Sequence, residues 1–405
     1  MIILLKIAAI IFILLFLIKL KTDLGLVLLL DSALTAILFG MPAAELLRQT
    51  GSALVARETL ELIGILVLVL YLGHFLQAGG HFKRMVAALK NLIRDSRLIL
   101  AIPSAFIGLL PMMAGAMMGA PIVEEAAQKW NLSPAWKTFL NYWFRHIWEY
   151  SWPLYLNLIL AASIVGVPIV KVCLSQFPFT VLAASAGLVI LFRHVPYERN
   201  DQADHRNWKD YGRVIGSIWP IFLTIILIFA VRLSMLTALV VSCVLSAAAT
   251  NMPARTRWEV VRKSVSLRIV LLTAAVMIFK RILETSGALE AVMTIVSPTG
   301  ISGIVLLFAA PFTIGLLTGV NQAFAAIAFP LLAPIIGREH PDMVLFLFAY
   351  VSGFVGILLS PAHLCLALTA DYFKADLKDV YKILVGPVSV VFVAALLTLV
   401  ILRLL

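Results

Sequence analysis

Apolar segments long enough to cross a membrane recur along almost the whole chain, and they restrict its fold more than any other feature. They lie at about 2–18, 24–40, 60–78, 98–126, 135–165, 177–194, 213–231, 233–250, 267–284, 300–336, 342–373 and 384–404. Because a backbone inside the bilayer must satisfy its own hydrogen bonds, such segments form helices. With 62% hydrophobic residues, far above a soluble domain, the chain is predicted to be an all-α polytopic membrane protein.

The first six segments match the last six in length and, at several points, in sequence. The matched blocks, separated by a nearly constant offset, are 107–110 with 314–317, 41–43 with 252–254, and Pro153 with Pro361. A constant offset across separate blocks indicates a duplication. We therefore predict a first repeat at 1–195, a cytoplasmic linker at 196–212 and a second repeat at 213–405.

Each repeat contains one segment rich in proline and glycine, followed by a helix that is interrupted. The segments at about 98–126 and 300–336 are predicted to be re-entrant hairpins, since irregular backbone at membrane depth is tolerated only inside protein or beside water. The alternative is an ordinary span kinked by proline. The helices that follow, at 135–165 and 342–373, are predicted to break. The expected breaks are Ser151-Trp152-Pro153 and Ser360-Pro361-Ala362.

Five crossings and a hairpin per repeat give an odd number, so the two repeats are predicted to have inverted topology. Most Lys and Arg then fall in loops on one side, which the positive-inside rule assigns to the cytoplasm. We therefore expect both termini outside, in the inner (cytoplasmic) cell membrane, with the N-terminal segment retained as a span. Segments 41–59 and 251–266 are predicted to be amphipathic arms at the interfaces, or else plain loops.

The charge and cysteine content exclude some partners and sites. There are 32 Lys and Arg against 21 Asp and Glu, a balance that could indicate nucleic acid. The spread of these basic residues over short loops fits membrane topology better, so no nucleic-acid partner is predicted. Cys173, Cys243 and Cys365 are scattered in apolar sequence, and neither a disulfide nor a metal site is expected from them.

A charged face lies deep within the first broken helix. Asn141, Arg145 and Glu149 are spaced at i, i+4 and i+8, so they share one side of it. Ser133 and Pro134 form a helix start; Arg145 then lies about 16 Å further on, near the middle of a core of about 30 Å. An ionisable residue at that depth is usually functional. We expect Arg145 to bind a carboxylate or phosphate, or else to be neutralised by Glu149 as a structural pair.

Neighbouring side chains suggest how transport could be coupled. Glu149 is the best candidate proton carrier. His146 could relay protons or bind substrate, or could be a satisfied interior histidine. His146 and Glu149 also form an H-x-x-E pattern, which is typical of metal ligands on a helix. No second ligand cluster matches it in the sequence, so no metal centre is predicted.

The helix breaks and the hairpin tips are expected to converge, because each leaves unpaired N–H groups that favour an anion. The first tip is expected near 111–115. With Arg145 and His146, the predicted substrate-binding residues are Asn141, Ser151, Thr318, Asn321, Gln322, Ser360 and His363. The oxygen atoms of Thr318, Asn321 and Ser360 could also hold Na+. The acidic residues Glu124, Glu125 and Asp371 are interpreted as solvated helix ends.

Inverted repeats with broken helices at mid-membrane are typical of secondary transporters. We therefore predict a secondary active transporter of a small organic anion coupled to H+ or Na+, with no other cofactor, and not an enzyme. One alternative is an intramembrane enzyme or lipid-phosphate-handling protein that uses Arg145, His146 and Glu149. A passive anion channel is the other.

The order of spans, arm, hairpin and broken span resembles the ion transporter superfamily. That group includes the divalent-anion/sodium symporters and the citrate, gluconate and arsenite transporters. The stretches FRHIWEY at 144–150 and PMMAGA at 111–116 resemble, more narrowly, an uncharacterised integral-membrane family within it. The resemblance implies an elevator mechanism, in which a transport domain slides against a scaffold that often forms a homodimer.

The chain departs from the dicarboxylate branch of that superfamily, which has Ser-Asn-Thr at hairpin tips and helix breaks. The corresponding places here read PMM at 111–113 and SWP at 151–153, and only Thr318 and Asn321 keep similar chemistry. The departure therefore argues against symmetric double Na+ coordination and against a dicarboxylate substrate. The departure favours proton coupling, with Arg145 and Glu149 in place of one cation.

Overall fold

The computed structural model describes residues 2–20, 22–109, 115–200, 203, 208–295, 301–337 and 339–404. These residues form helices and no strand, apart from one isolated bridge between Asp95 and Arg199. Four helices are long and apolar enough to cross a membrane: α4 (Arg57–Ala78), α11 (Ile169–His194), α12 (Trp208–Phe229) and α21 (Leu377–Leu404). The chain is therefore an all-α protein with the helices of a membrane protein, as predicted.

The remaining helices are shorter. In the first half they are α1 (Ile2–Lys19), α2 (Leu24–Leu38), α3 (Ala43–Val55), α5 (His81–Leu92), α6 (Ser96–Ile99), α7 (Ile102–Ile107), α8 (Gly115–Ala127), α9 (Pro134–His146) and α10 (Leu156–Val165), with 3-10 turns η1 (Gln128–Trp130) and η2 (Ile147–Tyr150). In the second half they are α13 (Met235–Ala249), α14 (Ala254–Ser264), α15 (Leu267–Thr285), α16 (Ala288–Ile295), α17 (Ile301–Thr318), α18 (Asn321–Ile336), α19 (Met343–Leu358) and α20 (Leu364–Phe373).

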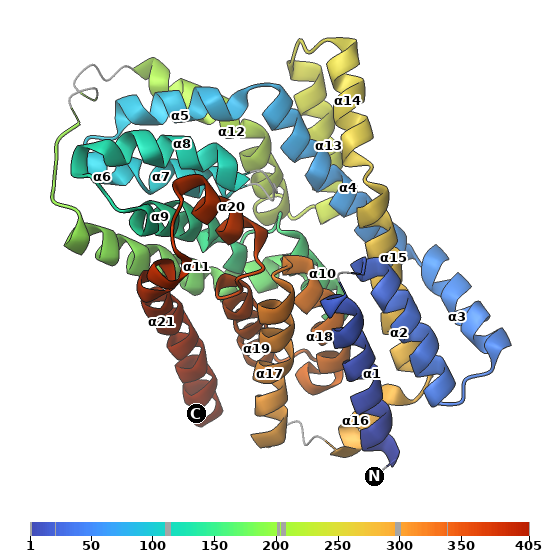
Figure 1. Ribbon diagram of the computed structural model, residues 1–405. Coiled ribbons are helices and arrows are strands. Elements are labelled where there is room, and N and C mark those ends of the chain that lie inside the picture. The colour runs from blue at the N-terminus through green and yellow to red at the C-terminus, as the bar shows by residue number, and fades with distance from the viewer. Residues whose placement is uncertain are drawn as a thin grey trace.

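Two groups of helices can be followed in Figure 1. At the right of the view, α2 packs against α15 and α4 packs against α13, while α3 and α14 lie along α15 and α4. The other group contains α7, α8 and α9 together with α17, α18, α19 and α20. Both chain ends lie at the lower edge of the view.

Local sequence explains where the two interrupted helices begin and stop. Ser133 caps α9 by accepting a hydrogen bond from the Trp136 backbone N–H at 3.4 Å, and Pro134 occupies the first turn. Asp342 caps α19 by accepting from the Val344 N–H at 2.8 Å. Helical structure then lapses at 151–155 and at 359–363, at the predicted breaks, where Pro153 and Pro361 cannot donate a backbone hydrogen bond.

The second hairpin is formed by α17 and α18, which are joined by Gly319 and Val320. Gly319 has a φ of +62°, and a Cβ there would overlap the backbone of Ala362 and come within 2.5 Å of the His363 nitrogen. Only glycine combines that conformation with so close an approach. The hairpin tip is therefore held against the second break. The predicted tip of the first hairpin lies outside the described residues, except for Gly115 at the start of α8.

Several boundaries differ from those expected. The helix predicted at 177–194 begins at Ile169, since Pro178 is accommodated inside it, and α21 begins at Leu377 and not near 384. The end of the predicted linker 196–212 is helical from Trp208. The short helices α5 and α16 lie between the predicted segments, in stretches for which the sequence predicts no helix. Both predicted arms contain helices, α3 and α14.

Candidate functional site

Six polar side chains from both halves of the chain meet at the interrupted helices. This central cluster consists of Arg145, His146, Glu149, Asn321, His363 and Cys365. The Arg145, His146 and Glu149 side chains are almost fully buried, and His363 and Cys365 are 5% and 6% exposed. Because ionisable groups are costly to bury at membrane depth, so many in one place mark a functional-site candidate.

The two histidines face each other through their Nε2 atoms, which are 3.1 Å apart. His146 Nδ1 lies 2.6 Å from the Tyr142 carbonyl oxygen, and His363 Nδ1 lies 2.7 Å from the Gly319 carbonyl oxygen. A carbonyl oxygen can only accept, so each Nδ1 carries a proton and donates it. Each ring is thereby held in place with its Nε2 directed at the other.

Arg145 reaches both sides of this histidine pair. Its Nη1 lies 3.2 Å from Cys365 Sγ and 3.3 Å from His146 Nε2. A Cβ at Gly115 would come 2.7 Å from Arg145 Nε, so the start of α8 leaves space for the guanidinium only because residue 115 is glycine. The cation is thus held between the N-terminus of α8 and the start of α20.

Glu149 contacts His146 and the second hairpin. The amide of Asn321, the first residue of α18, donates to one carboxylate oxygen, and the other lies 3.7 Å from His146 Nε2. Neither carboxylate oxygen of Glu149 lies within ion-pair distance of Arg145 in the part of the chain that the structure describes. His146 therefore lies between Arg145 and Glu149, which the alternative prediction paired directly.

Two tyrosines that were not among the predicted site residues form hydrogen bonds between the two interrupted helices. The Tyr142 hydroxyl donates to the Leu358 carbonyl at 3.2 Å, at the end of α19, and the Tyr350 hydroxyl donates to the Glu149 carbonyl at 2.8 Å. Each satisfies a carbonyl that a helix end leaves unpaired. The positions of Tyr142 and Tyr350 differ by the same offset as Pro153 and Pro361, a signal that could have identified them.

The other predicted residues lie near the cluster but bond elsewhere. Asn141 accepts from Ser104 at 3.1 Å and donates to the Ala116 carbonyl at 2.9 Å, so it joins α9 to both arms of the first hairpin. The Ser151 hydroxyl is hydrogen-bonded to Thr180, and the Thr318 and Ser360 hydroxyls donate to the Ile314 and Leu316 carbonyls. Thr318 and Ser360 also accept hydrogen bonds from the backbone N–H groups of Val320 and Ala362, both at 3.2 Å. Gln322 is half-buried and makes no hydrogen bond to a described residue.

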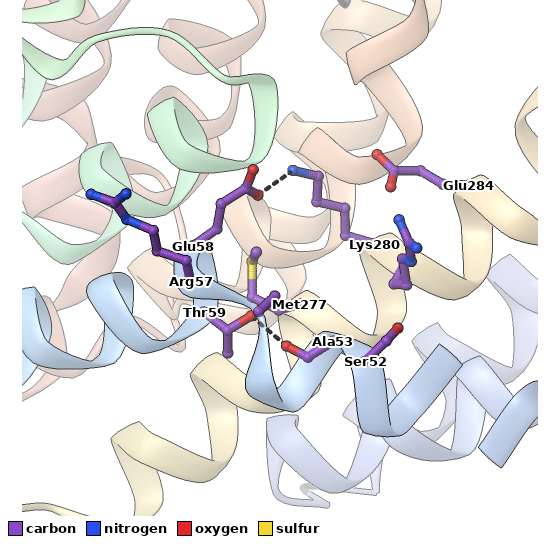
Figure 2. A pocket seen from close by; sticks show the side chains of 10 residues that line it. Ser52, Ala53, Arg57, Glu58, Thr59, Met277, Lys280 and Glu284 are labelled. Carbon is purple, nitrogen blue, oxygen red and sulfur yellow. Dashed lines mark hydrogen bonds and ion pairs between the residues drawn. The ribbon is translucent and has the colours of Figure 1, made fainter. Parts of the chain in front are cut away.

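Two cavities lie away from the central cluster. The larger, of about 300 Å³, opens where α3 meets α4 beside α15 (Figure 2). Its lysine and one of its arginines already have partners: Lys280 lies 3.7 Å from Glu58, and Arg281 Nε donates to Gln49 at 2.8 Å. The second, of about 230 Å³, is lined by residues such as Lys90 and Asn200. Neither contains a predicted site residue, so the buried cluster is the better candidate.

The model of one protein family matches residues 1–403 of this chain, and that family is described as a protein of unknown function (DUF401). A search of curated proteins finds no match. The family match covers both halves of the chain and every residue of the central cluster.

Proposed function

This chain belongs to the DUF401 family, and we propose from its own residues that it is a secondary active transporter of a small organic anion. The proposal includes coupling to H+ or Na+ and an elevator-type movement of the hairpins and broken helices. In that arrangement α2, α4, α13 and α15 belong to the scaffold, which could also hold a homodimer together.

Corresponding contacts support the proposal of two inverted repeats. The pair α2 and α15 has its counterpart in α13 and α4, and the pair α3 and α15 has its counterpart in α14 and α4. The pair α10 and α18 likewise has its counterpart in α20 and α8, and within single repeats the pair α7 and α9 has its counterpart in α17 and α19. Matching contacts of this kind are expected of a duplicated unit whose two copies pack against each other.

Ion pairs between distant helix ends support the proposed topology. Arg268 contacts Asp23 at 3.1 Å, and both lie at helix ends assigned to the cytoplasmic side. Lys280 contacts Glu58, and Arg403 contacts Asp342 at 2.8 Å, and these lie at helix ends assigned to the outer side. Each pair joins helix ends on the same proposed side, as the odd number of crossings requires.

The observation that carries the proposed cargo is the position of Arg145 beside the starts of two helices. Helix α8 begins at Gly115 beside the guanidinium, and α20 begins at Leu364, between His363 and the Cys365 that Arg145 contacts. Helix N-termini and a guanidinium both attract anions, and the guanidinium suits a carboxylate or phosphate. A small anion is therefore the cargo that this charge distribution favours.

Uptake into proteoliposomes tests the proposal. Purified full-length protein would be reconstituted and supplied with radiolabelled small carboxylates and phosphate under an imposed pH or Na+ gradient. We expect accumulation above equilibrium that collapses when an ionophore removes the driving gradient. Accumulation that ignores both gradients would refute the coupling. Rapid equilibration without accumulation would indicate a channel, and conversion of the solute without any gradient would indicate an enzyme.

Glu149→Gln is expected to abolish proton-driven uptake while sparing exchange of anion between the two sides. The amide keeps the size of the side chain and can still bond Asn321, but it cannot carry a proton. The measurement compares net uptake driven by a pH gradient with counterflow in proteoliposomes preloaded with the same anion. Unchanged pH-driven uptake in the variant would remove Glu149 from the coupling step.

A further inference from the structure

We propose that the central cluster contains a binding site for a divalent transition metal ion of the Zn2+ type. His146, His363 and Cys365 are the proposed ligands, and Glu149, whose carboxylate lies 3.7 Å from His146 Nε2, is proposed as the fourth. One donor pair comes from the end of α9 and η2, and the other comes from the start of α20 in the opposite half of the chain. Metal binding at these four side chains does not require the transport activity proposed above.

The histidine pair favours a positive species at its Nε2 atoms. Since both Nδ1 atoms donate to carbonyl oxygens, neutral His146 and His363 would direct two lone pairs at each other across 3.1 Å. In this structure the Arg145 guanidinium, 3.3 Å from His146 Nε2, supplies that positive charge, and a metal ion would supply it in its place. Carbonyl bonds at Nδ1 are also what orient metal-binding histidines and fix the tautomer that leaves Nε2 free.

The spacing of the donors suits one small ion. Two nitrogens at about 2.0–2.1 Å from zinc and 3.1 Å from each other subtend an angle of about 100° at the metal, close to tetrahedral. One ring nitrogen of each histidine and the Cys365 sulfur all lie within 4.8 Å of one another, and the three residues are buried. Nitrogen, thiolate and carboxylate donors are those that zinc selects, and thiolate and carboxylate together balance its charge.

Arg145 occupies the position that the metal would take. Its Nη1 is near both Cys365 Sγ and His146 Nε2, so a guanidinium and a metal ion cannot both be there. Metal binding at this position therefore requires the Arg145 side chain to move aside, and the thiol loses its proton on binding. Pro361, Ala362 and Leu364, which flank His363, are exposed, so the second break is the proposed entry for the ion. Metal and Arg145-bound anion are therefore expected to exclude each other.

The metal content of the purified full-length protein tests the site. Protein would be expressed in medium supplemented with Zn2+, so that the ion is present during folding, and its affinity tag would be removed before elemental analysis. We expect about one zinc per chain. His363→Gln and Cys365→Ser are expected to reduce the zinc content to background. Cys243→Ser is the control: it removes a buried cysteine of α13 that is not one of the proposed ligands, and it should keep the zinc.

Cobalt provides a second readout that reports the ligands directly. Wild-type protein and Cys243→Ser loaded with Co2+ should show intense visible bands of tetrahedral cobalt and a thiolate-to-cobalt charge-transfer band, which Cys365→Ser should lose. Background zinc in the wild type, or equal zinc in all variants, would overturn the site. Arg145→Gln is expected to retain zinc while losing anion uptake. The two measurements therefore separate failure of the metal site from failure of the transport proposal. Loss of zinc in that variant would contradict the proposed competition between the metal ion and Arg145.

Discussion

Arg145→Gln is expected to lower anion uptake in proteoliposomes by about 100-fold or more. Arg145 is the cation of the central cluster, is 4% exposed, and lies beside the N-termini of α8 and α20. Removing one charged partner from a buried polar contact typically costs about 2–5 kcal/mol, since the group left behind loses its compensation. Initial rates of radiolabelled uptake, normalised to reconstituted protein, give the measurement.

Two further substitutions separate loss of binding from loss of folding. Arg145→Lys keeps the charge but lacks the planar fork, so we expect it to fold and to bind the anion more weakly. Arg403→Gln is the matched control, because Arg403 pairs with Asp342 at the surface and both side chains are 36% exposed. Exposed pairs contribute about 0–1 kcal/mol, so its uptake should stay near wild type. Wild-type uptake by a folded Arg145→Gln protein would disprove the proposed anion contact.

Gly315→Ala is expected to lower the thermal unfolding temperature by about 1–4 °C, because α17 and α19 lie in backbone contact at this point. A Cβ at Gly315 would overlap the Gly353 carbonyl oxygen and lie 3.1 Å from the Ile357 nitrogen. On the facing helix, a Cβ at Gly356 would overlap the Phe312 carbonyl oxygen. Backbone cannot move aside as a flexible side chain can, so the second hairpin would be displaced from the break that it contacts.

Gly216→Ala is the matched control for that variant. Gly216 also lies within a long helix, α12, but a Cβ there meets nothing within 4 Å. Alanine is the better helix former by about 0.5–1 kcal/mol, so this variant should unfold at the wild-type temperature or slightly above it. Thermal unfolding of both detergent-purified variants provides the comparison. A Gly315→Ala protein as stable as Gly216→Ala would show that the two helices can separate without cost.

The helices and their interruptions were largely predictable because their causes are local. Long apolar stretches predict spans, and Ser133 with Pro134 predicts the start of α9. Pro153 and Pro361 predict the two breaks. Helix ends within amphipathic sequence were predicted less well. The helix α5 was missed because it combines basic residues with an apolar face that becomes evident only when α12 packs against it.

The composition of the central cluster was predictable in part. Arg145, His146 and Glu149 stand out because charge inside an apolar segment is rare, and Asn321 and His363 stand out because they flank chain interruptions. Cys365 does not, because a cysteine one residue into an apolar helix resembles core packing. The pattern His-x-Cys at 363–365 becomes a ligand pair only once it faces the His-x-x-Glu pattern at 146–149.

By itself the sequence determined the all-helical membrane fold, the places where helices stop, and the burial of a charged face, since hydropathy, proline and glycine act within a few residues. Only the tertiary structure decided that His146 meets His363, that Tyr142 and Tyr350 fasten opposite breaks, and that Glu149 bonds Asn321 and not Arg145. These contacts join positions roughly half the chain apart, and no local rule specifies them, because they depend on how two complete halves pack together.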